Sequence, residues 1–367
     1  MKVIHILDEL KFSGAEVMYI AAAPVFQDLG CELSVVNSNK NLGVCASLFE
    51  QAGYEVFHKP YPSSRFKSIS YCFQFIRFLK KNRYNVVHIH TNLFSMAFCA
   101  WMAGCRSVYT FHSVFYSRKL TRWYHRLQRW VSKRIFRCVF QTIGDSVYAQ
   151  EKNYYKNDSI KIYNWYNSNR YYPAREGERE IFRRELGIDP GTLVLISIGG
   201  CSPIKRHWEI INALPEVVAK YPDTIYLHLG EGTTLSEEQE LVNQSDISGH
   251  VRFCGNQTDI RKYLIASDIY LMTSVVEGVS ITAIETMACG IPEILYNSPG
   301  LRDFNNEMEC TLLVEQDPTS LANGIIWLYE NKEHQKKLTD NALKLVSSHF
   351  DMKKNATEIF KLYRKNP

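Results

Sequence analysis

The chain has 367 residues, of which 46% are hydrophobic and 22% charged, an ordinary composition for a soluble globular protein. Its length allows two domains with sizeable cores, and no apolar run approaches the roughly 20 residues that span a bilayer. Ten cysteines lie scattered, without a CxxC pair or metal-ligand spacing, and no signal peptide is evident. We therefore expect a cytoplasmic protein with reduced thiols.

The net charge of +5 is unevenly distributed along the chain. Residues 1–170 hold 23 Lys and Arg against 10 Asp and Glu, whereas residues 171–367 hold 20 against 28. This asymmetry indicates that the N-terminal half faces an anionic partner.

The N-terminal half begins as a doubly wound α/β unit. A buried strand at 3–7, a glycine-containing loop and a helix from Ala15 to Leu29 form its first repeat. The absence of G-x-G-x-x-G weighs against a nicotinamide or flavin dinucleotide site. Further strands are predicted at 32–36, 55–58, 86–90, 108–113 and 138–142, and helices at 46–52 and 69–81.

Three histidines lie on two of these strands. His88 and His90 share one strand face, and a metal pair there is disfavoured because no carboxylate or cysteine has matching spacing. His112 ends the predicted strand 108–113, at the carboxyl end of the sheet, where α/β sheets bind ligands. We expect His112 to contact a ligand; a structural histidine is the alternative.

Residues 118–137 form the most charged predicted helix. One face carries the cations Arg122, Arg126, Arg129, Lys133 and Arg137, and the other largely carries Leu120, Trp123, Leu127, Trp130, Val131 and Ile135. Such a helix suits docking on an anionic membrane. Alternatively, the apolar side packs on the sheet and the arginines are solvated. Nucleic-acid binding fits the basic face but not the rest of the chain.

A polar, arginine-rich segment, 169–184, is predicted to link a first domain, 1–168, to a second domain, 185–350. In the second domain, strands are expected at 193–199, 224–229, 251–255, 269–272 and 294–296. Helices are expected at 208–221, 260–266, 319–330 and 333–350.

The segment Ser274–Pro292 follows strand 269–272 and contains a helix with Ser280 as its predicted N-cap. Glu277 lies in the preceding loop and Glu285 inside the helix, an E-x7-E spacing. The helix N-terminus offers unpaired N–H groups for a phosphate, and the helix rises roughly 7–8 Å from Ser280 to Glu285. One carboxylate would then lie on each side of a bound diphosphate. The alternative is a surface helix with two solvated glutamates.

The run SVVEGVSITAIETMACGIP resembles the donor-binding motif of retaining glycosyltransferases of family 4. Ser13-Gly14-Ala15-Glu16 is similar to the family's Gly-Gly-Ala-Glu loop, and residues 85–90 are similar to its D-V-V-H-x-H strand. His112 stands at the family's T-x-H position. Residues 200–205 resemble the family's G-R-x-x-x-x-K loop, with Lys205 matching the lysine and Gly200 replacing the arginine.

The resemblance implies a GT-B fold: α/β, with two Rossmann-like, doubly wound parallel-sheet domains facing a central cleft. The donor would bind the second domain and the acceptor the first, and a helix within 351–367 would return to the first domain. The resemblance places donor binding at Gly14, Lys205, Arg206, Glu277, Gly278, Val279, Ser280 and Glu285.

The implied activity is metal-independent transfer from a nucleotide-sugar, most often a UDP-sugar, with no further cofactor. The acceptor would be a glycan, polyprenyl-linked as for several family members, at the inner face of the cytoplasmic membrane, in surface polysaccharide or glycoconjugate synthesis. Lys205 would neutralise the diphosphate, Glu277 would position the sugar, Glu285 would hold the ribose, and His112 would contact the sugar or acceptor. The missing arginine leaves a catalytically weak nucleotide-sugar-binding protein as an alternative, and a GT-B phosphorylase or hydrolase as another.

Overall fold

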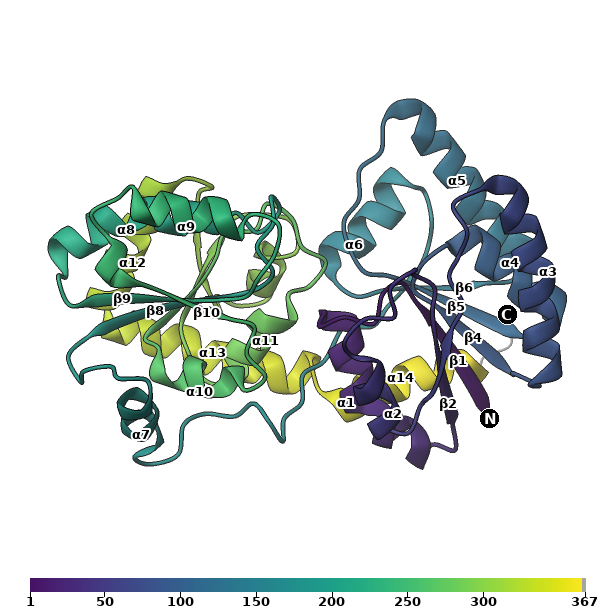
Figure 1. The fold of residues 1–367 in the computed structure, drawn as a ribbon, viewed down its shortest axis with the longest axis horizontal. Helices are drawn as coiled ribbons and strands as arrows, with labels where there is room; N and C mark the ends of the chain where they lie inside the picture. Colours follow the sequence, from purple (N-terminus) through teal and green to yellow (C-terminus); the bar gives the residue numbers. More distant parts are fainter. Residues whose placement is uncertain (365–367) are drawn as a thin grey trace. The chain divides into compact units, whose positions relative to one another are not determined.

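The computed structural model describes residues 1–364, apart from the side chains of Arg65 and Leu120. The chain divides into two compact units, one formed by residues 1–165 with the segment from Met352 onward, the other by Tyr166–Asp351. Each is a parallel sheet with helices on both faces (Figure 1). The expected α/β class with two Rossmann-like domains is confirmed.

The sheet of the first unit has seven strands in the order β3-β2-β1-β4-β5-β6-β7. Its strands are β1 (Lys2–Leu7), β2 (Glu32–Asn37), β3 (Glu55–His58), β4 (Val86–Ile89), β5 (Arg106–Phe111), β6 (Val139–Thr142) and β7 (Ile160–Lys161). Its helices are α1 (Gly14–Asp28), α2 (Ala46–Gln51), α3 (Arg65–Lys81), α4 (Leu93–Ala103), α5 (Lys119–Arg134), α6 (Asp145–Ala149), a π-helical turn (Gln150–Tyr154) and α14 (Met352–Arg364). Helices α3, α4 and α5 cover one face, and α1, α2 and α14 the other (Figure 1).

The sheet of the second unit has six strands in the order β10-β9-β8-β11-β12-β13. They are β8 (Leu193–Ile198), β9 (Thr224–Leu229), β10 (Val251–Gly255), β11 (Ile269–Met272), β12 (Glu293–Tyr296) and β13 (Leu312–Val314). The helices are α7 (Glu178–Glu185), α8 (His207–Lys220), α9 (Leu235–Asn243), α10 (Ile260–Ala266), α11 (Ile281–Ala288), α12 (Pro318–Glu330) and α13 (Lys332–His349), with 3₁₀ turns at Ser248–His250 and Arg302–Asn305.

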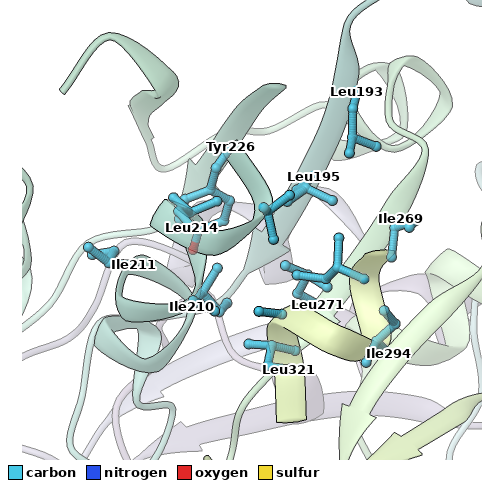
Figure 2. Close-up of a cluster of buried hydrophobic side chains, with 14 of the residues drawn as sticks. Leu193, Leu195, Ile210, Ile211, Leu214, Tyr226, Ile269, Leu271, Ile294 and Leu321 are labelled. Atoms are coloured by element: carbon cyan, nitrogen blue, oxygen red, sulfur yellow. The ribbon is translucent and has the colours of Figure 1, made fainter. Parts of the chain in front are cut away.

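The core of the second unit forms where strands with continuous apolar runs meet the inner faces of the helices. All six residues of β8 and all four of β11 are buried, as expected for central strands covered on both faces. Leu195, Leu271 and Ile294 belong to one buried cluster with Ile210 and Leu214 of α8 and Leu321 of α12 (Figure 2). This packing holds the ends of β8 and β11 in register, so the loops that follow them start from a rigid base.

Each sheet reverses its strand order at one point. The reversal lies between β1 and β4 in the first unit and between β8 and β11 in the second. In open α/β sheets the carboxyl ends of the two strands at such a switch point diverge, and ligands bind there. In the second unit, the loops that leave this point contain Lys205 and Glu277.

The expected segment boundaries need correction. Residues 169–184, predicted as a linker, belong to the second unit, where α7 begins at Glu178. Buried Arg183 of this helix donates to Ala266 O at 3.0 Å and to Asp268 Oδ2 at 2.7 Å, which attaches the segment to its sheet. Helices α4 and α9 and strand β13 were not predicted. Of the predicted C-terminal segment 351–367, residues 365–367 lie outside the described residues.

Helix α14 packs against α1 and β5 in the first unit. The Tyr363 hydroxyl lies 2.6 Å from His88 Nδ1, deep in the core. No helix within residues 1–364 is both long enough and apolar enough to traverse a bilayer.

Candidate functional site

The loops after β8 and β11 are joined directly to each other. Val275 N donates to Ile204 O at 3.0 Å. The buried Thr273 hydroxyl lies 2.8 Å from Lys205 O and 3.0 Å from Arg206 O. Because these bonds link the two backbones on both sides of Lys205, the position of one loop sets the position of the other.

Lys205 and Glu277 meet between these loops. Lys205 Nζ donates to Glu277 Oε1 at 2.8 Å, and the two side chains are 23% and 17% exposed. A Cβ on Gly199 would lie 3.3 Å from Lys205 Cε, so this glycine lets the lysine stem lie across the backbone. The alternative of two solvated glutamates is wrong, because Glu277 is ion-paired and Glu285 is buried.

The turn at residues 298–300 holds the backbone of Glu277 in place. Glu277 N donates to Pro299 O at 2.9 Å. Gly300 has a φ of +85°, and a Cβ there would stand 2.3 Å from Glu277 O. Only glycine allows this approach, since a side chain would collide with the Glu277 carbonyl.

The N-terminus of α11 follows the same loop. The Ser280 hydroxyl accepts from Ala283 N at 3.3 Å, which confirms Ser280 as the N-cap. Gly278 and Val279, which precede it, are buried. The N–H groups of the first turn that the cap does not satisfy remain available for an anion.

Glu285 lies one helical turn and more beyond the cap, in the interior of the unit. It is 5% exposed and faces the hydroxyl of Tyr171. Burial raises the pKa of this carboxyl to about 8, against the smaller opposing effects of Tyr171 and Arg170. Glu285 is therefore protonated at neutral pH and can donate as well as accept a hydrogen bond. The sequence did not predict Tyr171 as its partner, since 114 positions separate the two and no local pattern connects them.

Arg206 and Gly200, the two positions that bear on the missing arginine, have different surroundings. Arg206 forms an ion pair with Glu209 in the first turn of α8, so its charge is already matched. At Gly200, an added Cβ would meet only Glu231 O, at 3.4 Å, an ordinary contact. A Cβ therefore fits at the position where the family has arginine.

In the first unit, His112 lies at the end of a chain of imidazoles. His112 Nε2 lies 2.7 Å from His90 Nδ1, and His90 Nε2 lies 3.2 Å from His5 Nδ1. Burial lowers the pKa of His112 to about 4, so the ring is neutral at physiological pH and can only share hydrogen bonds. Gly14 is the first residue of α1, after Ser13, whose hydroxyl contacts Glu16.

Four cations of α5, namely Arg122, Arg126, Arg129 and Lys133, have partners within the first unit. Arg129 holds Glu151 through two hydrogen bonds of 2.7 and 2.8 Å, and its guanidinium lies 3.8 Å from the Tyr155 ring centroid. Arg126 donates to Tyr154 O, Lys133 donates to Asp158 O, and Arg122 lies over the Tyr154 ring. The expectation of a solvated arginine face is wrong, because carbonyls and a carboxylate of the 151–158 segment lie opposite these cations.

The aromatic face of α5 is the exposed one. Trp123 is 67% exposed, Trp130 56% and Tyr124 54%, and the side chain of Leu120 is outside the described residues. Exposed apolar residues continue on the preceding loop and on α3 and α4, namely Phe66, Ile69, Phe73, Phe94, Trp101, Met102, Phe115 and Tyr116. We call the α5 part, Trp123, Tyr124, Leu127 and Trp130, the aromatic face.

Two family profiles match this chain, one in each unit. "Glycosyltransferase Family 4" matches residues 12–167, and "Glycosyl transferases group 1" matches residues 178–345. The chain belongs to the group 1/family 4 glycosyltransferases. Lys205, Glu277 and the capped N-terminus of α11 all lie within the group 1 match, and His112 lies within the family 4 match.

Two relatives show how far the sequence similarity extends along this chain. The N-acetyl-alpha-D-glucosaminyl L-malate synthase of Bacillus anthracis is 25% identical over 207 residues, 56% of this chain and 53% of that protein. The chain thus matches about half the length of that relative. The putative glycosyltransferase EpsD of Bacillus subtilis is 25% identical over 268 residues, 70% of each chain.

Among solved structures, the Anabaena protein Alr3699/HepE, in complex with UDP and glucose, is similar over its whole length. The TM-score is 0.83 at 19% identity, with 100% of each chain covered. This likeness shows the fold, which is GT-B.

Proposed function

We propose that this family 4 glycosyltransferase moves a sugar, with retention of anomeric configuration, from a UDP-sugar to a glycan acceptor in surface polysaccharide or glycoconjugate synthesis. The observation that carries the proposal is the meeting of Lys205 and Glu277 beside the capped N-terminus of α11. A cation and free N–H groups suit a diphosphate, and an adjacent carboxylate suits sugar hydroxyls. The UDP, glucose and UDP-glucose complexes of Alr3699/HepE support the choice of donor.

In the proposed reaction, the bond between the anomeric carbon and the diphosphate breaks, and a bond from that carbon to the acceptor oxygen forms on the same face. The acceptor's hydroxyl proton passes to the departing diphosphate, so no protein base and no metal ion is needed. Lys205 and the α11 N-terminus stabilise the charge that develops on the leaving group. Glu277 orients the sugar, Glu285 holds the ribose, and the neutral ring of His112 contacts the sugar or acceptor by hydrogen bonding.

A thermal-shift panel of nucleotide-sugars tests the donor, because a ligand of the native state raises the melting temperature by mass action. We expect UDP-sugars to raise it and Lys205→Ala to abolish the shift and lower transfer by about 10²–10³-fold. Lys220→Ala, at an exposed site on α8, is the control. Normal transfer by Lys205→Ala would exclude the leaving-group role.

Two alternatives make different predictions for the same purified chain. Donor binding without transfer to lipid-linked or soluble glycans would favour a catalytically weak binding protein, for which Gly200 in place of the family's arginine is the motivating observation. Sugar-phosphate formation from an oligosaccharide and free phosphate, with no nucleotide, would favour a phosphorylase.

We further propose a lipid-linked acceptor, met at the inner face of the cytoplasmic membrane through the aromatic face of α5. Exposed Trp and Tyr prefer the interface between water and lipid headgroups, and Trp123, Tyr124 and Trp130 are each more than half exposed. The basic N-terminal half would add attraction to anionic lipids. The cations Arg122, Arg126, Arg129 and Lys133 then act by shaping the surface rather than by touching lipid.

Sedimentation with anionic phosphatidylglycerol vesicles tests the membrane contact. We expect the double variant Trp123→Ser/Trp130→Ser to lose most vesicle binding and to keep UDP-sugar binding. Trp327, on α12 of the second unit, is 44% exposed. The control variant Trp327→Ser should therefore bind vesicles normally. Equal binding by both variants would exclude the aromatic face as the contact.

A further inference from the structure

Three buried side chains with metal-binding chemistry converge near the loop that carries Lys205. Cys201 comes from the loop after β8, His228 from β9 and Glu238 from α9. One ligand atom from each lies within 4.8 Å of the other two, and the residues are 1%, 0% and 1% exposed. Sequence spacing concealed the cluster, because 27 and 10 positions separate its members.

The measured distances fit a tetrahedral ion. His228 Nε2 lies 3.0 Å from Glu238 Oε2 and 3.8 Å from Cys201 Sγ. Ligand atoms at about 2.0–2.3 Å from a tetrahedral zinc ion stand roughly 3.3–3.6 Å from one another. Both distances lie within about half an ångström of these values.

The charge of the cluster also favours a bound cation. Glu238 is a buried carboxylate whose ion-pair partner, among the described residues, is His228. Buried charges in proteins are paired or bind metals. A divalent ion with one thiolate, one carboxylate and one neutral imidazole gives a site of zero net charge. A sulfur, nitrogen and oxygen ligand set suits zinc among the common metals.

Neighbouring groups hold two of the ligands in place. The Thr234 hydroxyl donates to Glu238 Oε1 at 2.7 Å, which orients the carboxylate and leaves Oε2 for an ion. His207 Nδ1 lies 2.8 Å from His228 Nε2 and is the nearest candidate for a fourth ligand. Ligation through Nε2 leaves the proton of His228 on Nδ1, which has no partner among the described residues. That unpaired N–H opposes binding, whereas neutralisation of the buried Glu238 carboxylate favours it.

A second histidine cluster, in the first unit, is a weaker candidate. Ligand atoms of His5, His88 and His90 also lie within 4.8 Å of one another. Both ring nitrogens of His88, however, are already bonded, to Tyr363 at 2.6 Å and Thr110 at 2.8 Å. Three neutral imidazoles would also leave the full charge of a divalent ion uncompensated in the core.

We propose that Cys201, His228 and Glu238 bind one zinc ion, with His207 or a water molecule as the fourth ligand. Cys201 releases its thiol proton to solvent when the ion binds, so affinity falls as the pH falls. The ion links β9 and α9 to the loop after β8, at Cys201, four residues before Lys205. Its role is structural: it holds the loop that presents Lys205 and takes no part in sugar transfer.

Zinc content of the full chain, expressed in zinc-supplemented medium and desalted, tests the site directly. We expect about one zinc per chain, a melting temperature that falls on addition of EDTA, and a thiolate-to-metal absorption band after cobalt(II) replaces zinc. A wild-type chain that holds less than about a tenth of an equivalent, and takes up none on titration of the EDTA-treated protein, would overturn the proposal.

Variants assign the ligands. Cys201→Ser and Glu238→Gln should each lose most of the zinc, whereas Cys254→Ser, at a half-buried cysteine on β10, should keep about one equivalent. Should Cys201→Ser not fold, the cobalt spectrum of the wild type decides, since cobalt binding without the thiolate band excludes Cys201. These readouts do not depend on donor or transfer, so they separate this site from the proposed activity.

Discussion

Lys205 Nζ and Glu277 Oε1 lie 2.8 Å apart although 72 positions separate the two residues in the chain. Each side chain neutralises the other while largely shielded from water. In the proposed donor complex, a nucleotide-sugar would replace this contact, because its diphosphate would attract the lysine and its sugar hydroxyls would donate to the carboxylate. The pair thus keeps both groups in position before the ligand arrives.

Replacing Glu277 by Gln should separate binding from turnover. The amide keeps the shape but frees the Lys205 charge, so UDP affinity should hold or rise while kcat falls by about 10²-fold. Calorimetric UDP titration and steady-state rates measure the two effects. Glu237→Gln, an exposed residue of α9, is the matched control. A parallel loss of affinity and rate would contradict this division of roles.

Gly300→Ala should disrupt the site by displacing the Glu277 loop. The new Cβ would sit 2.3 Å from Glu277 O at a φ of +85°, so the Glu277 loop must move. We expect loss of UDP binding and a fall of about 1–3 kcal/mol in the free energy of unfolding, from backbone strain. Gly249→Ala, which meets nothing within 4 Å, should change neither. Unaltered UDP binding by Gly300→Ala would show that the turn does not position Glu277.

The buried carboxyl of Glu285 predicts a specific pH dependence of stability. Its folded pKa of about 8 lies above the ordinary 4.5, so between these values the folded chain keeps a proton that the unfolded chain has lost. Stability should fall as pH rises through this window, by up to about 1.4 kcal/mol per pH unit, and level off above it. In Glu285→Gln this contribution is absent.

Denaturant unfolding of wild type and Glu285→Gln at pH 5, 6.5 and 8 measures the effect. The variant should gain stability relative to wild type as the pH rises, and Glu237→Gln should follow wild type throughout. A difference between Glu285→Gln and wild type that is constant with pH would mean that Glu285 is ionised in the folded chain.

Arg129→Ala should be among the most destabilising changes in α5. It leaves Glu151, whose side chain is 2% exposed, as an unpaired buried carboxylate, which typically costs about 3–5 kcal/mol. Arg134→Ala, at an exposed position of the same helix, should stay within about 0.5 kcal/mol of wild type. Urea unfolding compares them, and equal stability would indicate that the pair is solvated in solution.

Gly200→Arg tests the departure from the family pattern. The backbone there needs no positive φ, and the added Cβ makes only an ordinary contact with Glu231 O. A second cation beside the diphosphate should tighten UDP binding by about 3–30-fold, as a charged hydrogen bond does. Gly200→Gln, which adds similar bulk without charge, is the control. Equal affinities in the two variants would show that the missing arginine does not limit donor binding.

Local pattern was enough for much of the fold and part of the site. The alternation of apolar strands and helices indicated two doubly wound domains, and Ser280 marked the start of α11. These features depend on residues close in sequence, since a cap is satisfied within three residues and a strand by its own apolar run. Helix α4 was missed because it is apolar on nearly every side and shows no periodic face.

The amphipathic pattern of α5 correctly indicated two faces and wrongly indicated their environments. Periodicity separates the cations from the aromatics, but which face is buried depends on the partner. Here the partner segment, 151–158, offers carbonyl oxygens and Glu151, which hydrogen-bond Arg126 and Arg129 and leave Trp123 and Trp130 in solvent.

From the sequence alone came the family resemblance, the two-domain α/β architecture and the identities of Lys205, Glu277, Glu285 and His112 as candidates. The tertiary structure alone decided that Lys205 pairs with Glu277, that Glu285 is buried against Tyr171, and that Cys201, His228 and Glu238 converge. The physical reason is range: capping and periodicity act within a helical turn, whereas charge pairing, burial and ligand geometry depend on which distant loops the sheet order brings to the same edge.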